Sequence, residues 1–170
     1  MKYFKVSGNK GFTLIEALIV IALVGTIAAI ASPSFVRQVR NANLREAARD
    51  FSSDFAYWRQ RAVSENVHYR IVIDSDTNSY KIQIATISTP EDDSDYVDLY
   101  PSRVKNFCSK SESVKYYSTT FPGTPPRITI QPRGTVSPAG TVILKHNLLP
   151  GRQASIIVNL LGRVNVEYSG

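Results

Sequence analysis

The sequence predicts an α+β protein in which one long N-terminal helix is followed by an antiparallel sheet of short strands. Three observations support this prediction. An apolar run lies near the start of the chain, an apolar stripe at helical spacing follows it, and from residue 67 onward apolar and polar residues alternate. A period of 3.6 is typical of a helix and a period of two of a strand. Because the helical pattern comes first and the strands follow together, the order favours α+β over an alternating α/β fold.

The apolar run covers residues 12–31 and is long enough for a helix to cross a membrane. A bilayer core about 30 Å thick needs ~20 apolar residues in a helix, and this run has 20 residues with Glu16 as its only charge. A carboxylate at membrane depth costs about 2.5–3.5 kcal/mol on insertion scales. Glu16 therefore needs a partner. A secretory signal peptide, with residues 28–31 as its small-residue cleavage region, or a simple anchor is the alternative interpretation.

An amphipathic helix is predicted to continue beyond this run. Its apolar residues recur at alternating steps of three and four. They are Leu44, Ala48, Phe51, Phe55, Trp58 and Ala62. The arginines and carboxylates between them are interpreted as a solvated face, with a nucleic-acid stripe as the alternative. With its end at Asn66, the helix runs from about Phe12 to about Glu65, a length of about 80 Å at 1.5 Å per residue. Gly25 and Pro33 are the positions expected to disturb it.

Seven short strands are predicted after the helix. Residues 67–73 and 80–85 alternate on either side of a turn composition at residues 74–79, which predicts a β-hairpin. Turns rich in proline and glycine separate the other five strands. These are expected at residues 114–119, 127–131, 141–145, 154–159 and 163–168. Residues 88–113 are polar and irregular and are predicted to form a loop.

No catalytic constellation is recognisable in the sequence. Neither His68 nor His146 has a nucleophile or a metal-ligand spacing around it, and there is no glycine-rich phosphate loop. The single cysteine, Cys108, excludes an intramolecular disulfide. We therefore expect that the protein is not an enzyme and that it holds no cofactor and no resident metal. For the carboxylate-rich loop at residues 91–98, a surface or subunit contact is favoured, and calcium capture is the alternative.

The basic leader, the apolar run and the string between them resemble the processing site of type IV prepilins and pseudopilins. The string is Gly11-Phe12-Thr13-Leu14-Ile15-Glu16. The resemblance implies that a membrane aspartyl peptidase cuts after Gly11 and that Phe12 is then N-methylated. It also implies that Glu16 is needed for assembly, where it pairs with the terminal amine of a neighbouring subunit. Gly25 and Pro33 lie where pilins often carry helix-disturbing residues; a kink at the membrane edge with no assembly role is the alternative.

The C-terminal region resembles the GspH/FimT minor pilins and pseudopilins. The resemblance rests on residues 128–136, 138–141, 156–158 and 161–164. It implies a type IV pilin-like fold in four parts. These are a cleaved leader at residues 1–11, a transmembrane and filament-core helix at 12–32, its amphipathic second half at 33–66, and a periplasmic β-rich domain at 67–170.

The function implied is that of a structural subunit of a type IV pilus or a type II secretion pseudopilus, in assembly initiation or at the tip. The implied location is the bacterial inner membrane, crossed once, with the C-terminal domain in the periplasm. The implied partners are other pilin or pseudopilin subunits, prepilin peptidase, the inner-membrane assembly platform and the lipid bilayer.

DNA binding during natural transformation is the alternative function. Some FimT-type members bind DNA through a G-R-x-R motif, and the sequence here is Gly162-Arg163-Val164-Asn165. Asn165 replaces the second arginine, so any patch would need Arg152, Arg133 or Lys145 beside Arg163. Of the net charge of +6, the leader carries three lysines. The remaining charge does not by itself argue for nucleic acid.

Overall fold

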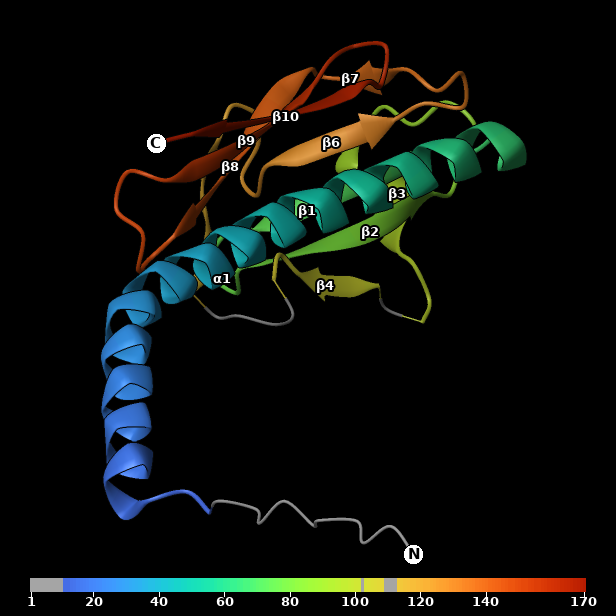
Figure 1. The fold of residues 1–170 in the computed structure, drawn as a ribbon. Helices are drawn as coiled ribbons and strands as arrows, with labels where there is room; N and C mark the ends of the chain where they lie inside the picture. The colour runs from blue at the N-terminus through green and yellow to red at the C-terminus, as the bar shows by residue number, and fades with distance from the viewer. Residues whose placement is uncertain (1–10, 102, 109–112) are drawn as a thin grey trace, which may run out of the picture. The chain divides into compact units, whose positions relative to one another are not determined.

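The structure, a computed structural model, describes residues 11–101, 103–108 and 113–170, and for Ala31 and Pro33 the backbone alone. In these residues the long helix α1 (Leu14–Glu65) precedes all the strands (Figure 1). The strands are β1 (Tyr69–Asp74), β2 (Ser79–Ala85), β3 (Tyr96–Asp98), β4 (Val104–Asn106), β5 (Val114–Thr119), β6 (Arg127–Ile130), β7 (Val136–Ser137), β8 (Gly140–His146), β9 (Gln153–Val158) and β10 (Val164–Ser169). A single 3₁₀ turn, η1 (Asp93–Asp95), precedes β3. The chain forms two compact units, Met1–Gln38 and Val39–Gly170.

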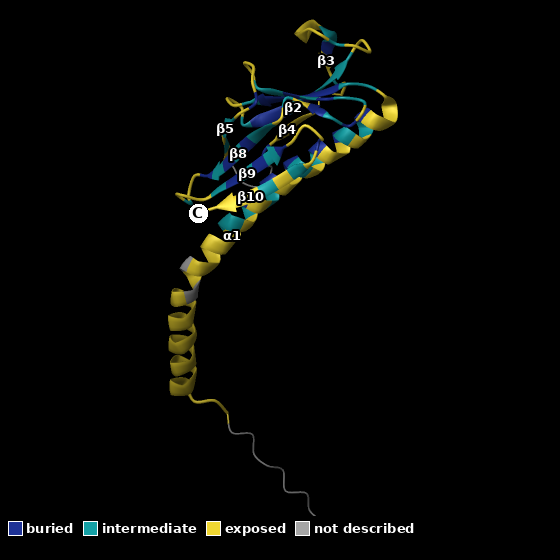
Figure 2. Cartoon of the chain, turned by 90° about the horizontal axis from the view of Figure 1, so that it is seen from above, coloured by how far each residue is buried: buried dark blue, intermediate teal, exposed yellow. Residues whose placement is uncertain are grey.

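The described part of the first unit is an exposed apolar helix. Every described side chain from residue 11 to residue 30 is exposed (Figure 2), and Ile30 reaches 74%. The backbone stays helical through Gly25 and Pro33. Among the described residues no single helix is long and apolar enough to cross a membrane, whereas Leu14–Ile30 and Ser34–Glu65 meet the criterion together as a bent pair, by length and composition alone. Apolar side chains in this number need a partner that the monomer does not supply.

The second unit contains two antiparallel sheets, and not the one sheet that the sequence predicted. The larger sheet has the order β3-β2-β1-β6-β7, with β4 also paired to β2, and the smaller has the order β10-β9-β8-β5. All seven predicted strands are present. Strands β3, β4 and β7 were missed, because two or three residues are too few to show a period of two. Two of them, β3 and β4, lie in the stretch predicted as a loop and pair with different ends of β2.

One hydrophobic core fills the space between α1 and both sheets. The predicted stripe from Leu44 to Ala62 is confirmed, because each of its six residues is at most 4% exposed. Phe51 packs edge-to-face on Tyr80 of β2 with ring centroids 5.1 Å apart, and both rings contact Phe107. Strands β1, β6, β8 and β9 contribute the buried aliphatic residues on the other side. The core is therefore complete within residues 39–170.

Two asparagines with positive φ end the main elements. Asn66 has φ +55° and follows the last helical residue, as predicted for the helix end. Asn78 has φ +54° in the β1–β2 turn. Its side chain donates to the carbonyl of Val114 at 3.0 Å and accepts the amide hydrogen of Tyr116 at 2.6 Å. The turn of the larger sheet is thus fastened to β5 of the smaller one.

The buried stripe predicts a large loss of stability for Phe55→Ala. Because Phe55 is fully buried, truncation leaves a cavity and should lower the free energy of unfolding of residues 39–170 by about 3–5 kcal/mol. Urea unfolding followed by the fluorescence of Trp58, the only tryptophan, measures this change. Arg49→Ala, at an exposed position of the same helix, is the control and should change it by less than about 0.5 kcal/mol. Equal losses in both variants would contradict the assigned stripe.

Candidate functional site

The N-terminal segment leaves the Gly11–Phe12 peptide bond open to solvent. Residues Gly11 to Thr13 have no regular secondary structure, and α1 begins at Leu14. Phe12 is 81% exposed, and no atom lies within 4 Å of the position of a Cβ on Gly11. A peptide bond outside the helix is accessible without unwinding, whereas a bond inside the helix would first have to unwind.

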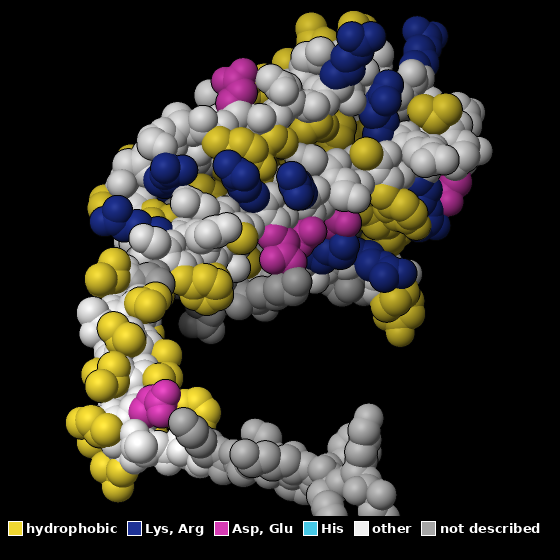
Figure 3. All heavy atoms as spheres, viewed as in Figure 1, with side chains coloured by type: hydrophobic (Ala, Val, Ile, Leu, Met, Phe, Trp, Pro, Cys, Tyr) yellow, Lys and Arg dark blue, Asp and Glu magenta, His cyan; other side chains and the backbone are white. Residues whose placement is uncertain are grey.

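Glu16 has a local role that the sequence analysis missed. The Thr13 hydroxyl accepts the amide hydrogen of Glu16 at 3.3 Å, so Thr13 caps the helix. The Thr-x-x-Glu spacing is that of a capping box, and a carboxylate in the first turn interacts favourably with the helix dipole. Figure 3 shows one acidic side chain among hydrophobic ones on the segment of α1 that precedes residue 31. This cap forms within one chain and needs no neighbouring subunit.

Arg59 fastens α1 to a turn from each sheet. Its Nε donates to the carbonyl of Gly134, between β6 and β7, at 2.7 Å. Its NH2 group donates to the carbonyl of Leu161, between β9 and β10, at 3.2 Å. The sequence analysis placed Arg59 on a solvated face, and this was wrong. Helical periodicity predicts the face of the helix to which a side chain is attached. A long arginine side chain can nevertheless carry its guanidinium group to partners beyond that face.

The glycines of the C-terminal pattern make room for this contact. Gly134 and Gly162 have φ +78° and +71°, which L-residues rarely adopt. A Cβ on Gly162 would lie 2.5 Å from the Nε of Arg59 and 2.5 Å from the carbonyl oxygen of Gly134. Gly140 differs, since its φ is not in the left-handed region; a Cβ there would lie 2.8 Å from the ring of Phe121. Gly140 is therefore required by the nearby ring of Phe121 and not by its backbone conformation.

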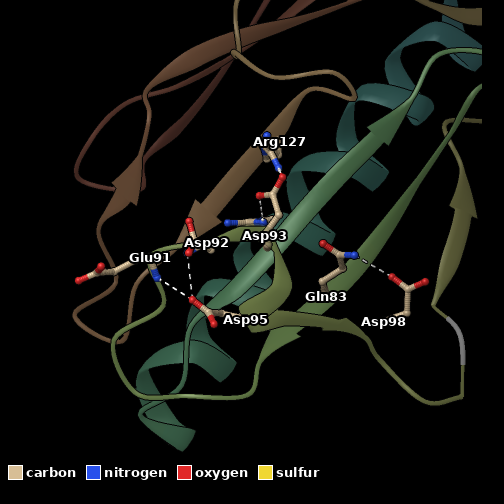
Figure 4. Close-up of polar contacts among 8 residues, drawn as sticks. Gln83, Glu91, Asp92, Asp93, Asp95, Asp98 and Arg127 are labelled. Carbon is tan, nitrogen blue, oxygen red and sulfur yellow. Dashed lines mark hydrogen bonds and ion pairs between the residues drawn. The ribbon is translucent and has the colours of Figure 1, made fainter.

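Within residues 91–98 the carboxylates of Asp93, Asp95 and Asp98 are held by protein groups (Figure 4). Asp93 is paired with Arg127 and with the buried Arg70. The Asp95 carboxylate accepts the amide hydrogens of Glu91 and Asp92, each at 2.9 Å. Among the described residues no group of three or more His, Cys, Asp or Glu is placed to hold a metal. The loop is therefore a fixed ion-pair network on the larger sheet.

These contacts lower the pKa values of the carboxyl groups involved. Arg127, followed by Arg70, holds the pKa of Asp93 below its ordinary value. Asp98 has a lowered pKa because Gln83 donates a hydrogen bond to it and Lys81 lies beside it. Arg70 also stacks on the ring of Tyr96, with its Cζ 3.4 Å from the centroid.

The basic residues proposed for DNA binding do not form one patch. In the β9–β10 ladder Val158 pairs with Val164, and Gln153 pairs with Ser169. Arg163 therefore lies at one end of this ladder and Arg152 at the other, about 20 Å apart at ~3.3 Å per residue. Arg133 lies beside Gly134, at the Arg163 end, whereas Lys145 pairs with Gln153, at the Arg152 end. No single groove lined by all four basic residues is present in the described part of the chain.

The cysteine and the two histidines lie among groups that give them a structural role. Cys108 is a buried free thiol in the core. His146 is 3% exposed, and its Nδ1 accepts the amide hydrogen of Leu148 at 3.1 Å. Burial, followed by the charge of Arg40, lowers the pKa of His146. Burial also lowers the pKa of His68.

Comparison with known protein families decides the assignment. The family described as type II transport protein GspH matches residues 47–162, and the prokaryotic N-terminal methylation motif matches residues 6–32. The chain belongs to the GspH family. The first match covers most of the buried stripe of α1 and all strands from β1 to β9, and the second covers the string that contains Gly11 and Glu16. A comparison with curated protein sequences found no significant match.

Solved structures of GspH-like proteins share the fold of this GspH-family chain. The minor pseudopilin EpsH from the type 2 secretion system of Vibrio cholerae has a TM-score of 0.58 at 13% identity, over 74% of this chain and 96% of that one. The type IV minor pilin FimU of Pseudomonas aeruginosa has a TM-score of 0.54 at 17% identity, over 75% of this chain and 90% of that one.

The predictions of the α+β pilin-like fold and of the GspH/FimT family are confirmed. The chain is a membrane-anchored, pilin-like structural protein of the minor pilin and pseudopilin family, and membership implies assembly with other pilin subunits. The leader predicted at residues 1–11 lies, apart from Gly11, outside the described residues. DNA binding gains no support over the structural role.

The glycine contacts predict that Gly162→Ala destabilises this GspH-family domain more than Gly151→Ala does. Both positions have positive φ, and backbone strain costs about 1–3 kcal/mol. Only at Gly162 would the new Cβ also collide with Arg59 and Gly134, since nothing lies within 4 Å at Gly151. The free energies of unfolding of the two variants, measured in urea, separate the cost of backbone strain from the cost of the steric collision. Equal losses would mean that the close approach of Arg59 is unimportant.

The network around Asp93 predicts a pH dependence of stability. A carboxyl group whose pKa is lower in the folded protein stabilises the fold above its unfolded pKa, ~3.9, and loses this contribution as pH falls through the folded pKa. Asp93→Asn should therefore weaken the domain at pH 7 and change its stability little at acid pH, where the wild-type carboxyl is protonated. Urea unfolding at both pH values measures the difference. A loss of the same size at both pH values would exclude the ionic mechanism.

Proposed function

We propose that this GspH-family chain is a minor pilin or pseudopilin subunit, cut after Gly11, methylated at Phe12 and inserted into a type IV pilus or type II secretion pseudopilus. The observation that carries the proposal is the division of α1 between two environments. Residues 39–65 complete a core, while the described side chains of residues 12–30 are exposed. A bilayer can cover the latter before assembly, and a bundle formed with the N-terminal helices of other pilin or pseudopilin subunits can cover them in a filament.

The role proposed for Glu16 follows from the chemistry of the new N-terminus. Cleavage would release a cationic amine on Phe12, one helical turn from the carboxylate of Glu16. Within an apolar helix bundle an unpaired charge is strongly unfavourable. Pairing the amine of one subunit with Glu16 of the next neutralises both groups and fixes the axial position of the incoming helix. The proposed residues are thus Gly11 and Phe12 for processing and Glu16 for assembly.

The proposed location follows from the charge of the leader. Lys2, Lys5 and Lys10 precede the apolar run, and short segments rich in lysine stay on the cytoplasmic side. The domain would then be periplasmic, beyond an inner membrane crossed once. Prepilin peptidase and the assembly platform in that membrane are the partners that such a subunit requires. We propose action in assembly initiation or at the tip, as minor subunits are incorporated in small numbers.

Gly11→Leu tests the processing step. Because the peptidase must fit the residue before the scissile bond closely, this change should leave the full-length chain in the membrane. The shift in electrophoretic mobility and the N-terminal residue, determined by mass spectrometry, measure cleavage. The matched control is Gly8→Leu, three residues upstream in the same leader, which should still yield a chain that begins at methylated Phe12. A mature terminus other than Phe12 would overturn the proposal.

Glu16→Gln tests the assembly step separately. The amide retains the size of the side chain and removes its charge, so cleavage should continue while incorporation into sheared filaments falls at least tenfold. Immunoblots of the membrane and filament fractions measure both steps, with Asp50→Asn in the domain as the control. Normal incorporation of the Glu16 variant would leave this residue with helix capping alone.

A further inference from the structure

A group of four basic side chains lies at one end of the second unit. Lys115 of β5 and Lys145 of β8 are direct partners in the smaller sheet, and Arg152 precedes β9. Arg40 of α1 donates from NH1 to the carbonyl of Leu148 at 3.2 Å, which ties the β8–β9 loop to the helix. We name these four residues the basic end. Figure 1 shows the β8–β9 loop beside α1 at this end of the domain.

No acidic side chain forms a salt bridge with the basic end in the described part of the chain, and the backbone of Gly170 lies beside Gly151 and Arg152. Lys115, Lys145 and Arg152 line a cavity of about 480 Å³ together with Tyr117, and none of its described lining residues is acidic. The Nζ of Lys145 lies 3.2 Å from the ring centroid of Tyr117. Like charges directly opposite one another in a sheet are unfavourable, so this arrangement favours an external anion.

The distance along the chain indicates which anion is available. Arg40 lies eight residues beyond Ser32, the last residue of the predicted membrane segment. Eight residues span about 12 Å as a helix and at most about 28 Å when extended. Whatever the arrangement of the two units, the basic end stays within reach of lipid headgroups. Arg163 lies about 20 Å farther along the β9–β10 ladder, at the other end.

We propose that the basic end docks on anionic phospholipid headgroups of the membrane that holds the N-terminal helix. Phosphate groups would enter the cavity between Lys145 and Arg152, and Leu148, which is 53% exposed, would lie against the bilayer surface. The inference rests on the proposed function, because it requires residues 12–32 to be in the membrane. Docking would hold the stored subunit on the bilayer, and transfer into a filament would break the contact.

The test uses the full chain in nanodiscs of phosphatidylcholine, with and without phosphatidylglycerol. Hydrogen–deuterium exchange of the amides of residues 147–152 should slow at least threefold when phosphatidylglycerol is present. High salt should remove the effect, since surface attraction is screened within about 10 Å at 0.1 M salt. The double variant Lys145→Gln/Arg152→Gln should also remove it. The matched control, Arg133→Gln/Arg163→Gln, removes the same charge at the opposite end and should retain the slowing.

Each other outcome has a defined meaning. Unchanged exchange with phosphatidylglycerol, or equal loss in both double variants, overturns the docking proposal. Slowing of the same amides by duplex DNA in phosphatidylcholine nanodiscs, without any effect of phosphatidylglycerol, assigns the basic end to nucleic acid and also overturns it. Thermal unfolding of each variant verifies its fold. Failure of the chain to insert into either nanodisc contradicts the membrane segment of the proposed function, whereas insertion without slowing contradicts docking alone.

Discussion

The burial of one stripe of α1 is the interaction on which the domain depends. Phe51, Phe55 and Trp58 supply the helix side of one core, to which β1 of the larger sheet and β8 and β9 of the smaller sheet also contribute buried residues. The same helix exposes its apolar side chains before residue 31. One continuous helix therefore has a segment whose apolar side chains are buried within the monomer. Its other segment has apolar side chains that only a bilayer or other subunits can bury.

Polar contacts then fix how the two sheets sit around this helix. Arg59 bonds to Gly134 in a turn of the larger sheet and to Leu161 in a turn of the smaller one. Asn78 joins the β1–β2 turn to β5. The hydrophobic effect has no direction, whereas these bonds do, so they select one arrangement among several that would bury the same rings. Gly134 and Gly162 lie at the contact with Arg59, and close packing there accounts for both glycines.

The sequence predicted the features that depend on periodicity. It missed those that depend on contacts between residues distant in sequence. The helix end at Asn66, the buried stripe and seven strands followed from spacing that a few residues suffice to show. The second sheet did not, because strand order is set by contacts distant in sequence. The contact of Arg59 with two turns could not be predicted either, because the residues around Arg59 in the sequence give no indication that Gly134 or Gly162 lies near it. The Thr-x-x-Glu spacing does predict the Thr13–Glu16 cap. Glu16 was instead interpreted only through its resemblance to a pilin glutamate.

The distribution of charge along the domain also distinguishes the functions considered. A duplex-binding surface needs several cations placed along one path of the phosphate backbone. Here Arg163 and Arg133 lie at one end of the smaller sheet, and Lys145 and Arg152 at the other. The second group lies on either side of the β8–β9 loop that Arg40 holds, and in the docking proposal anionic headgroups would meet it there. In that proposal the eight residues that separate Arg40 from Ser32 would give even weak headgroup contacts a high effective concentration, which a soluble polyanion would have to match from bulk solution.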